Sequence, residues 1–165
     1  MDASRRAHET PVTRGLWVWL ATGCGIGRLP WAPGTWGSAA GCAIGWALAG
    51  RVSPAAGLAG LALTLALFAW VSGLGERQLQ SHDPPSFILD EIWGMAAILL
   101  LAPQAAARWL PLACAFLFFR FFDTVKPPPL KLLARLPGGL GIMADDVGAA
   151  AYALALTWLV LRAGV

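Results

Sequence analysis

The nine acidic residues of this chain fall in four patches, and the last three patches are clusters that long uncharged runs separate. The clusters are Asp83 with Asp90 and Glu91, then Asp123 beside Lys126, and finally Asp145 with Asp146. If the intervening runs are helices that cross a membrane, all three clusters lie at the same face. Hard divalent cations such as Mg2+ require oxygen ligands, which carboxylates supply. The pattern therefore predicts metal-assisted chemistry at a membrane surface.

The first cluster leads directly into an apolar run. Adjacent residues of a helix point about 100° apart, so we expect Asp90 and Glu91 to face different points. One carboxylate would ligate metal while its neighbour supports a second metal, a lysine or a helix N-terminus. An acidic helix start without metal is the alternative. His82 is interpreted as a base, a metal ligand or a solvated loop residue.

The second cluster places a carboxylate between two cations. Asp123 and Lys126 are three residues apart, so they are expected to share a helical face until the prolines at 127–129 end the helix. A carboxylate for metal beside cations for phosphate suits a phosphate ester. An ordinary salt bridge between Asp123 and Lys126 explains that pair equally well, but it leaves Arg120 among phenylalanines unexplained.

The third cluster follows a glycine-rich segment, residues 138–141, and runs into the last apolar stretch. Glycine allows the backbone to approach a ligand closely. We expect Asp145 and Asp146 to lie at the entrance of the last helix and to project into the bundle. Helix capping by either residue is the alternative.

A further Gly/Pro-rich segment, residues 25–38, opens the first long helix. Free N–H groups at a helix start attract anions, so we expect Gly34, Thr35 and Ser38 to border a phosphate. Flanking tryptophans favour the membrane interface. The segment is therefore predicted to form the wall of a lateral opening for a lipid, with Thr35 facing the acids and Trp31 or Trp36 facing lipid. A plain Gly/Pro turn is the alternative.

Composition favours a helix bundle in a membrane. Hydrophobic residues make up 58% of the chain and charged residues 13%, whereas soluble domains carry about 25% charged residues. We predict an all-α, compact polytopic bundle of about five short helices with one acidic site; a soluble all-α protein is the alternative. The expected helices are 36–50, 55–74, 92–102, 109–122 and 147–161, with 15–21 as an interfacial segment. Residues 1–14 form a polar N-terminal tail, and residues 15–165 form one domain.

Basic residues predict the orientation of this bundle. Nine of the twelve Lys and Arg residues lie on the side of the acidic clusters, and the exceptions are Arg51, Arg108 and Arg162. The positive-inside rule then places the acids in the cytoplasm. Nucleic-acid binding is excluded as a function class, because no basic stripe stands without interleaved acids.

Four ordered motifs within residues 25–152 resemble the phosphatidylglycerophosphatase A family. They are Pro33-Gly34-Thr35 with Gly37-Ser38, Asp90-Glu91 followed by Gly94, Arg120-x-x-Asp123-x-x-Lys126-Pro127, and Gly138-Gly139-x-Gly141-Ile142-Met143-x-Asp145-Asp146. The resemblance implies an Mg2+-dependent phosphatase of the bacterial inner membrane, multi-pass, with a cytoplasmic active site. Such an enzyme converts phosphatidylglycerophosphate to phosphatidylglycerol, and no obligatory protein partner is implied.

The resemblance also implies a role for each motif residue. The implied catalytic residues are Asp90, Glu91, Asp123, Lys126, Asp145 and Asp146. The implied metal ligands are Glu91, Asp123, Asp145 and Asp146, and the implied substrate contacts are Gly34, Thr35, Ser38, Arg120 and Lys126. Lys126 and Arg120 would stabilise charge on the transferring phosphoryl oxygens. Direct attack by water is favoured because no serine or cysteine nucleophile is evident, and an aspartyl-phosphate intermediate is the alternative.

Two other functions compete with this one. A small ion-binding or transport membrane protein would also carry acids within the membrane. Pathway acids should lie in the middle of helices, whereas these are expected at helix ends. A lipid-alcohol phosphotransferase would need a longer carboxylate array, with Asp-Gly and Ala-Arg elements, that the chain lacks.

Overall fold

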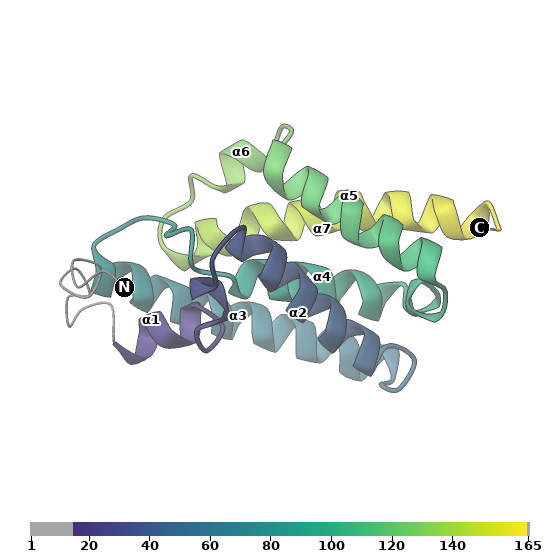
Figure 1. Ribbon diagram of the computed structural model, residues 1–165, viewed down its shortest axis with the longest axis horizontal. Coiled ribbons are helices and arrows are strands. Elements are labelled where there is room, and N and C mark those ends of the chain that lie inside the picture. Colours follow the sequence, from purple (N-terminus) through teal and green to yellow (C-terminus); the bar gives the residue numbers. More distant parts are fainter. Residues whose placement is uncertain (1–14, 165) are drawn as a thin grey trace.

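The computed structural model describes residues 15–164, and this part of the chain is helical without a strand (Figure 1). The elements are α1 (Leu16–Ala21), η3 (Ile26–Arg28), α2 (Pro33–Leu48), α3 (Pro54–Leu79), α4 (Leu89–Leu101), η4 (Pro103–Ala107), α5 (Trp109–Val125), α6 (Leu130–Leu133) and α7 (Gly139–Arg162). The all-α prediction is confirmed. The five expected helices correspond to α2, α3, α4, α5 and α7, and the interfacial segment corresponds to α1. The predicted tail, residues 1–14, lies outside the described residues.

Proline and serine define where several helices begin. Pro33 opens α2 and Pro54 opens α3, at the first helical position, where proline loses no intrahelical hydrogen bond. Ser53 caps α3, because its side chain accepts a hydrogen bond from the Ala56 backbone N–H at 3.3 Å. The cap satisfies one of the free donors of the first turn.

Small residues allow α2 to pack closely on α4. A Cβ added at Gly41 would overlap the Ile92 carbonyl oxygen, and one added at Gly45 would lie 3.0 Å from the Ala96 Cα. A larger side chain at either position would push the helices apart. This packing holds the first turn of α4, which carries Asp90 and Glu91, against the start of α2.

The buried core links the helices that carry the acidic clusters. Met95 and Leu99 of α4 pack with Phe119 of α5 and Ala149 of α7, and all four are fully buried. A second buried group joins α1, α3 and the start of α4 through residues such as Val18 and Ile88. The N-terminal part of α4 is therefore fixed from both sides.

Two of the described helices, α3 and α7, are long and apolar enough to cross a membrane. The others are shorter: α2, with 16 residues, and α4, with 13, measure about 24 Å and about 20 Å at 1.5 Å per residue, below the ~30 Å of a hydrocarbon core. Figure 1 shows the α2–α3 turn, the α4–α5 connection and the C-terminal end of α7 at one end of the bundle. The acidic clusters lie away from that end.

Candidate active site

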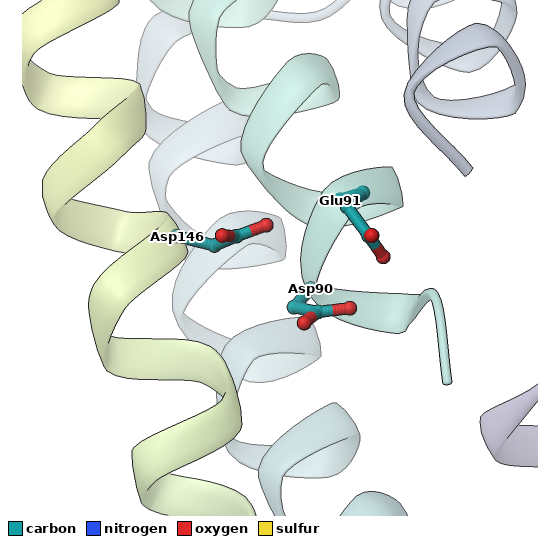
Figure 2. A group of neighbouring side chains, drawn as sticks. All are labelled: Asp90, Glu91 and Asp146. Atoms are coloured by element: carbon teal, nitrogen blue, oxygen red, sulfur yellow. The ribbon is translucent and has the colours of Figure 1, made fainter. Parts of the chain in front are cut away.

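Three carboxylates converge between α4 and α7. Asp90 and Glu91 come from the first turn of α4, and Asp146 projects towards them from α7 (Figure 2). One oxygen from each of the three lies within 4.8 Å of the others. Asp146 is 1% exposed, whereas Asp90 and Glu91 are partly buried.

The prediction that Asp90 and Glu91 face different points is wrong. Both stand in the first turn of α4, whose N-cap is Ile88. Side chains tilt towards the N-terminus of a helix, and no preceding turn blocks them here. The two carboxylates, one of them on a longer side chain, can therefore bend to the same point beyond the helix end.

The prediction that the last acidic pair lies at a helix entrance is also wrong. α7 begins at Gly139, so Asp145 and Asp146 lie about two turns inside the helix. The glycine-rich segment is helical because it packs without side chains: a Cβ at Gly139 would overlap the Ala69 carbonyl oxygen, and one at Gly141 would overlap that of Leu136. The two aspartates diverge as adjacent helical residues should. Asp146 joins the carboxylate group, and Asp145 turns to Lys126.

Arg120 links α5 to both α4 and α2. Its Nη1 atom lies 2.6 Å from Asp123 Oδ2 and 4.0 Å from Glu91 Oε1. The same nitrogen donates a hydrogen bond to Ser38 Oγ at 3.3 Å. This explains why an arginine stands among phenylalanines, and it places a cation at the rim of the carboxylate group.

Lys126 does not share a helical face with Asp123, contrary to the prediction. α5 ends at Val125, and Lys126 follows it with a positive φ of 47°. The proline at 127 disfavours the helical conformation for the residue before it. Lys126 therefore turns away and forms an ion pair with Asp145. Burial lowers the pKa of Lys126, but its contact with Asp145 outweighs burial and raises the pKa above its ordinary value.

The start of α2 closes the carboxylate group from another side. A Cβ at Gly34 would overlap Glu91 Oε1 and would lie 2.9 Å from Arg120 Nη1. Ser38 is fully buried, and its hydroxyl donates to the Gly34 carbonyl at 2.9 Å. Thr35, in contrast, is exposed. Gly34 and Ser38 thus border the carboxylate group and Arg120, whereas Thr35 is exposed, as are Trp31 and Trp36.

The carboxylate group is electrostatically suited to a cation. Burial raises the pKa of Glu91 to about 8, and the charges of Asp146 and Asp123 contribute, against the opposing effects of Asp90 and Arg120. Burial and the charge of Glu91 likewise raise the pKa of Asp90. Asp90 Oδ1, Glu91 Oε2 and Asp146 Oδ2 are buried and have no hydrogen-bond partner among the described residues. Buried acceptors without donors are costly, and a divalent cation would satisfy all three.

Glu76, near the end of α3, was not identified as a functional residue from the sequence. It is 8% exposed, and its Oε1 atom accepts hydrogen bonds from His82 Nδ1 at 2.7 Å and from the Asp83 backbone N–H at 2.8 Å. The signal was an acid directly after an apolar run, where buried carboxylates are rare unless paired or functional. It was missed because the helix was expected to end at Leu74, which left Glu76 in a loop.

Asp83 lies in the segment between α3 and α4, where its backbone N–H donates to Glu76. Burial raises its pKa, the charge of Lys126 lowers it, and that of Asp145 raises it. The polar groups at the end of α3 therefore include Asp83 as well as Glu76 and His82.

Comparison with known proteins places the chain in one family. The model of the family described as phosphatidylglycerophosphatase A matches residues 19–161. The phosphatidylglycerophosphatase A of Haemophilus influenzae is 36% identical over 142 residues, which cover 86% of this chain and 86% of that protein. The phosphatidylglycerophosphatase A of Escherichia coli is 30% identical over 152 residues, covering 87% of this chain and 83% of that protein.

A third relative carries another name. The putative phosphatidylinositol-3-phosphatase of Bacteroides thetaiotaomicron is 34% identical over 142 residues, which cover 84% of this chain and 89% of that protein. No solved structure matches the chain.

Proposed function

Because the chain belongs to the phosphatidylglycerophosphatase A family, we propose that it is an Mg2+-dependent enzyme that converts phosphatidylglycerophosphate to phosphatidylglycerol. The observation that carries the proposal is a group of three converging carboxylates, the partly buried Asp90 and Glu91 and the buried Asp146, with Arg120 beside Glu91 and Lys126 paired with the adjacent Asp145. Carboxylates suit a hard divalent metal, and the cations suit the phosphate that the metal would also contact.

Asp90, Glu91 and Asp146 are the residues we assign to Mg2+. A magnesium ion held there supplies charge neutralisation for the phosphate and makes a water molecule more acidic. Asp123 and Asp145, which the family resemblance also implies as ligands, are engaged with Arg120 and Lys126. When a phosphate takes over these two cations, the two aspartates become free to act as further ligands or as proton acceptors.

Arg120 and Lys126 are the residues we assign to the phosphoryl oxygens. Both are partly buried, so their charges act through a medium of lower dielectric than bulk water. Gly34 leaves room beside Glu91 and Arg120 where any side chain would collide. Direct attack by water is the favoured route, because the Ser38 hydroxyl is buried and already donates to Gly34. An aspartyl-phosphate intermediate is the alternative.

The enzyme is proposed to span the bacterial inner membrane several times, with the site at the cytoplasmic face. Support comes from the apolar helices α3 and α7 and from the basic residues on the side of the acids. The position of Asp145 and Asp146 inside α7 favours the competing function, an ion pathway. The fixed cations Arg120 and Lys126 weigh against it, because they would repel a passing cation.

A second candidate substrate is phosphatidylinositol 3-phosphate. Its basis is the name of the Bacteroides thetaiotaomicron relative, which is nearly as similar to this chain as the Haemophilus influenzae protein. Both lipids present a phosphomonoester on a headgroup that a phosphodiester joins to diacylglycerol. The acidic site could bind both phosphomonoesters in the same way, so contacts with the rest of the headgroup must determine which lipid is the substrate.

The deciding experiment measures phosphate release by the purified protein in detergent micelles. Phosphatidylglycerophosphate, phosphatidylinositol 3-phosphate and phosphatidic acid are supplied separately, each with Mg2+ and with a chelator. We expect Mg2+-dependent release chiefly from phosphatidylglycerophosphate and none from the Asp146→Asn variant. Chief release from the inositol lipid would favour the second substrate, and no release from any lipid would overturn the proposed function.

A further inference from the structure

A cavity of about 850 Å³ lies outside the carboxylate group, between α3 and the start of α7. One part of its lining is apolar and includes Ala66, Ala69 and Trp70 of α3 and Leu140 of α7. Trp70 and Leu140 are 57% and 62% exposed, so the cavity is an open groove on the side of the bundle. We call it the α3–α7 groove.

Glycine creates this groove. Gly73, Gly138 and Gly139 lie along it and present no side chain. Gly73 and Gly139 also bring the two helices into contact, since a Cβ at Gly73 would lie 3.2 Å from the Gly139 backbone nitrogen. The groove therefore lies on two closely packed helices.

The other part of the lining is polar. It includes Glu76, Arg77, Ser81 and His82. Glu76 holds His82 through the hydrogen bond to Nδ1, which leaves the exposed imidazole with a fixed orientation. Arg77 is exposed and makes no ion pair among the described residues. Within the described part of the chain, Arg77 is thus a cation without a carboxylate ion-pair partner at the polar end of the groove.

The groove has the dimensions and the polarity of one leaflet of a bilayer. From Ala66 to Arg77 the helix rises about 16 Å, at 1.5 Å per residue, which is about half of the ~30 Å hydrocarbon core. The apolar part lies within α3, a helix able to cross a membrane, and the polar part lies at its C-terminal end. A diacyl phospholipid has the same order of parts: an apolar chain, then an anionic phosphodiester.

The polar end of the groove leads on to the proposed active site. The groove is lined by His82 and also by Gly139 and Leu140 of α7. The same helix carries Asp145, the partner of Lys126, in its next turn. In phosphatidylglycerophosphate one glycerol unit separates the phosphodiester from the terminal phosphate. A lipid with its diester beside Arg77 would direct its terminal phosphate towards Lys126.

We propose that the α3–α7 groove binds the diacylglycerol-phosphate part of the lipid substrate, with an acyl chain along Ala66 and Trp70 and the phosphodiester beside Arg77. This inference rests on the proposed function, and it locates the lipid at α3 and α7 instead of at the segment 25–38. A lipid tail is as apolar as the groove wall, so leaving the bilayer for the groove brings little affinity. The groove instead orients the lipid, and holding its terminal phosphate in place lowers the activation barrier of hydrolysis.

The test fills the groove with one bulky side chain. Ala66→Trp places an indole in the groove, and Ala62→Trp is the matched control, because Ala62 is exposed on the same helix one turn earlier and does not line the groove. Each variant is assayed on diacyl phosphatidylglycerophosphate and on glycerophosphoglycerophosphate, the same headgroup without acyl chains. We expect Ala66→Trp to lower kcat/KM for the diacyl lipid by about tenfold or more, since misplacement by about 1 Å can cost 10²-fold. The chain-free substrate should be hydrolysed as by the wild type.

A second measurement does not depend on turnover. Wild-type protein in vesicles is irradiated with a phosphatidylglycerol that carries a photoreactive group in one acyl chain, and the labelled peptides are mapped by mass spectrometry. We expect labelling at Trp70 or Leu140, reduced by Ala66→Trp and unchanged by Ala62→Trp.

The outcomes separate the two proposals. Equal activity of both variants on the diacyl lipid, or labelling spread evenly over α3 and α7, would overturn the groove as the lipid site while the phosphatase function stands. Absence of phosphate release by the wild type would overturn the function, and the labelling experiment would still decide whether the groove takes a lipid. If Ala66→Trp fails to fold, the wild-type labelling pattern decides alone.

Discussion

The backbone of Gly34 lies directly against the carboxylate of Glu91, so closely that a Cβ at Gly34 would overlap Oε1. These residues are far apart in the sequence, at the start of α2 and the start of α4. Their contact brings the N-terminal turns of two helices together at one point. Both turns present free N–H groups and positive dipole ends, which favour the negative charge of carboxylate and phosphate in the same small volume.

The first prediction follows from this contact. Gly34→Leu should lower phosphate release from phosphatidylglycerophosphate by about tenfold or more, because the new side chain displaces Glu91 and Arg120, and small displacements in a site are costly. The protein should remain folded and membrane-bound. Gly60→Leu is the control, since a Cβ there meets no atom within 4 Å. Full activity of Gly34→Leu would show that this end of α2 is not part of the site.

The second prediction concerns Lys126. If its ammonium contacts the phosphate mainly in the transition state, Lys126→Ala should lower kcat by roughly 10²-fold or more with a small change in KM. Lys131→Ala, at an exposed position of α6, should leave kcat unchanged. Near-normal turnover of Lys126→Ala would mean that the lysine serves only to neutralise Asp145.

The third prediction addresses the metal. Asp146→Asn keeps the shape of the side chain but removes its charge. The variant should bind Mg2+ more than about tenfold more weakly, because loss of a direct metal ligand costs more affinity than loss of a residue that only supports a ligand. Binding is measured directly with Mn2+ by electron paramagnetic resonance, in competition with Mg2+. Unchanged affinity would exclude Asp146 from the metal site, whatever happens to the activity.

The fourth prediction is the pH dependence of stability in the metal-free protein. The pKa of Glu91 is about 8 in the folded state against an ordinary 4.5, so folding retains a proton that the unfolded chain loses. The retained proton therefore lowers the free energy of unfolding. This loss of stability is absent below about pH 4.5 and grows until about pH 8. The raised pKa values of Asp83 and Asp90 have the same sign, while the raised pKa of Lys126 has a constant effect in this window. The melting temperature in detergent with chelator should therefore fall from pH 5 to pH 8.

Mg2+ should reverse this trend, because it binds the deprotonated carboxylates. The rise in melting temperature on adding Mg2+ should be small at pH 5 and larger at pH 8. Glu91→Gln serves as the control, and it should flatten the dependence on pH in chelator. A variant with the same slope as the wild type would show that Glu91 does not retain the proton.

Much of this protein was predictable from local sequence patterns. Charge-free runs, prolines at 33 and 54 and the serine cap at 53 place the long helices, because length, hydrophobicity and capping are properties of neighbouring residues. The gathering of acids at one side also follows from the order of polar and apolar segments. The sequence did not predict which carboxylates meet, since Asp90 and Glu91 can reach one point only because both stand in the first turn of α4, with no preceding turn to block them.

Tertiary packing decided the partners of each charged residue. The glycine-rich segment was expected to precede the last helix, yet Gly139 packs on α3, Gly141 packs on the backbone of Leu136, and both lie in the first turn of α7. This earlier helix start places Asp145 and Asp146 in the second turn instead of at the entrance. Arg120, and not Lys126, pairs with Asp123, because the proline after Lys126 turns Lys126 out of the helix towards Asp145. The sequence by itself determined the helices and the side of the bundle on which the acids lie, because both depend on neighbours along the chain. Only the three-dimensional contacts between helices, which join residues distant in sequence, decided which carboxylates converge and which ones pair with a cation.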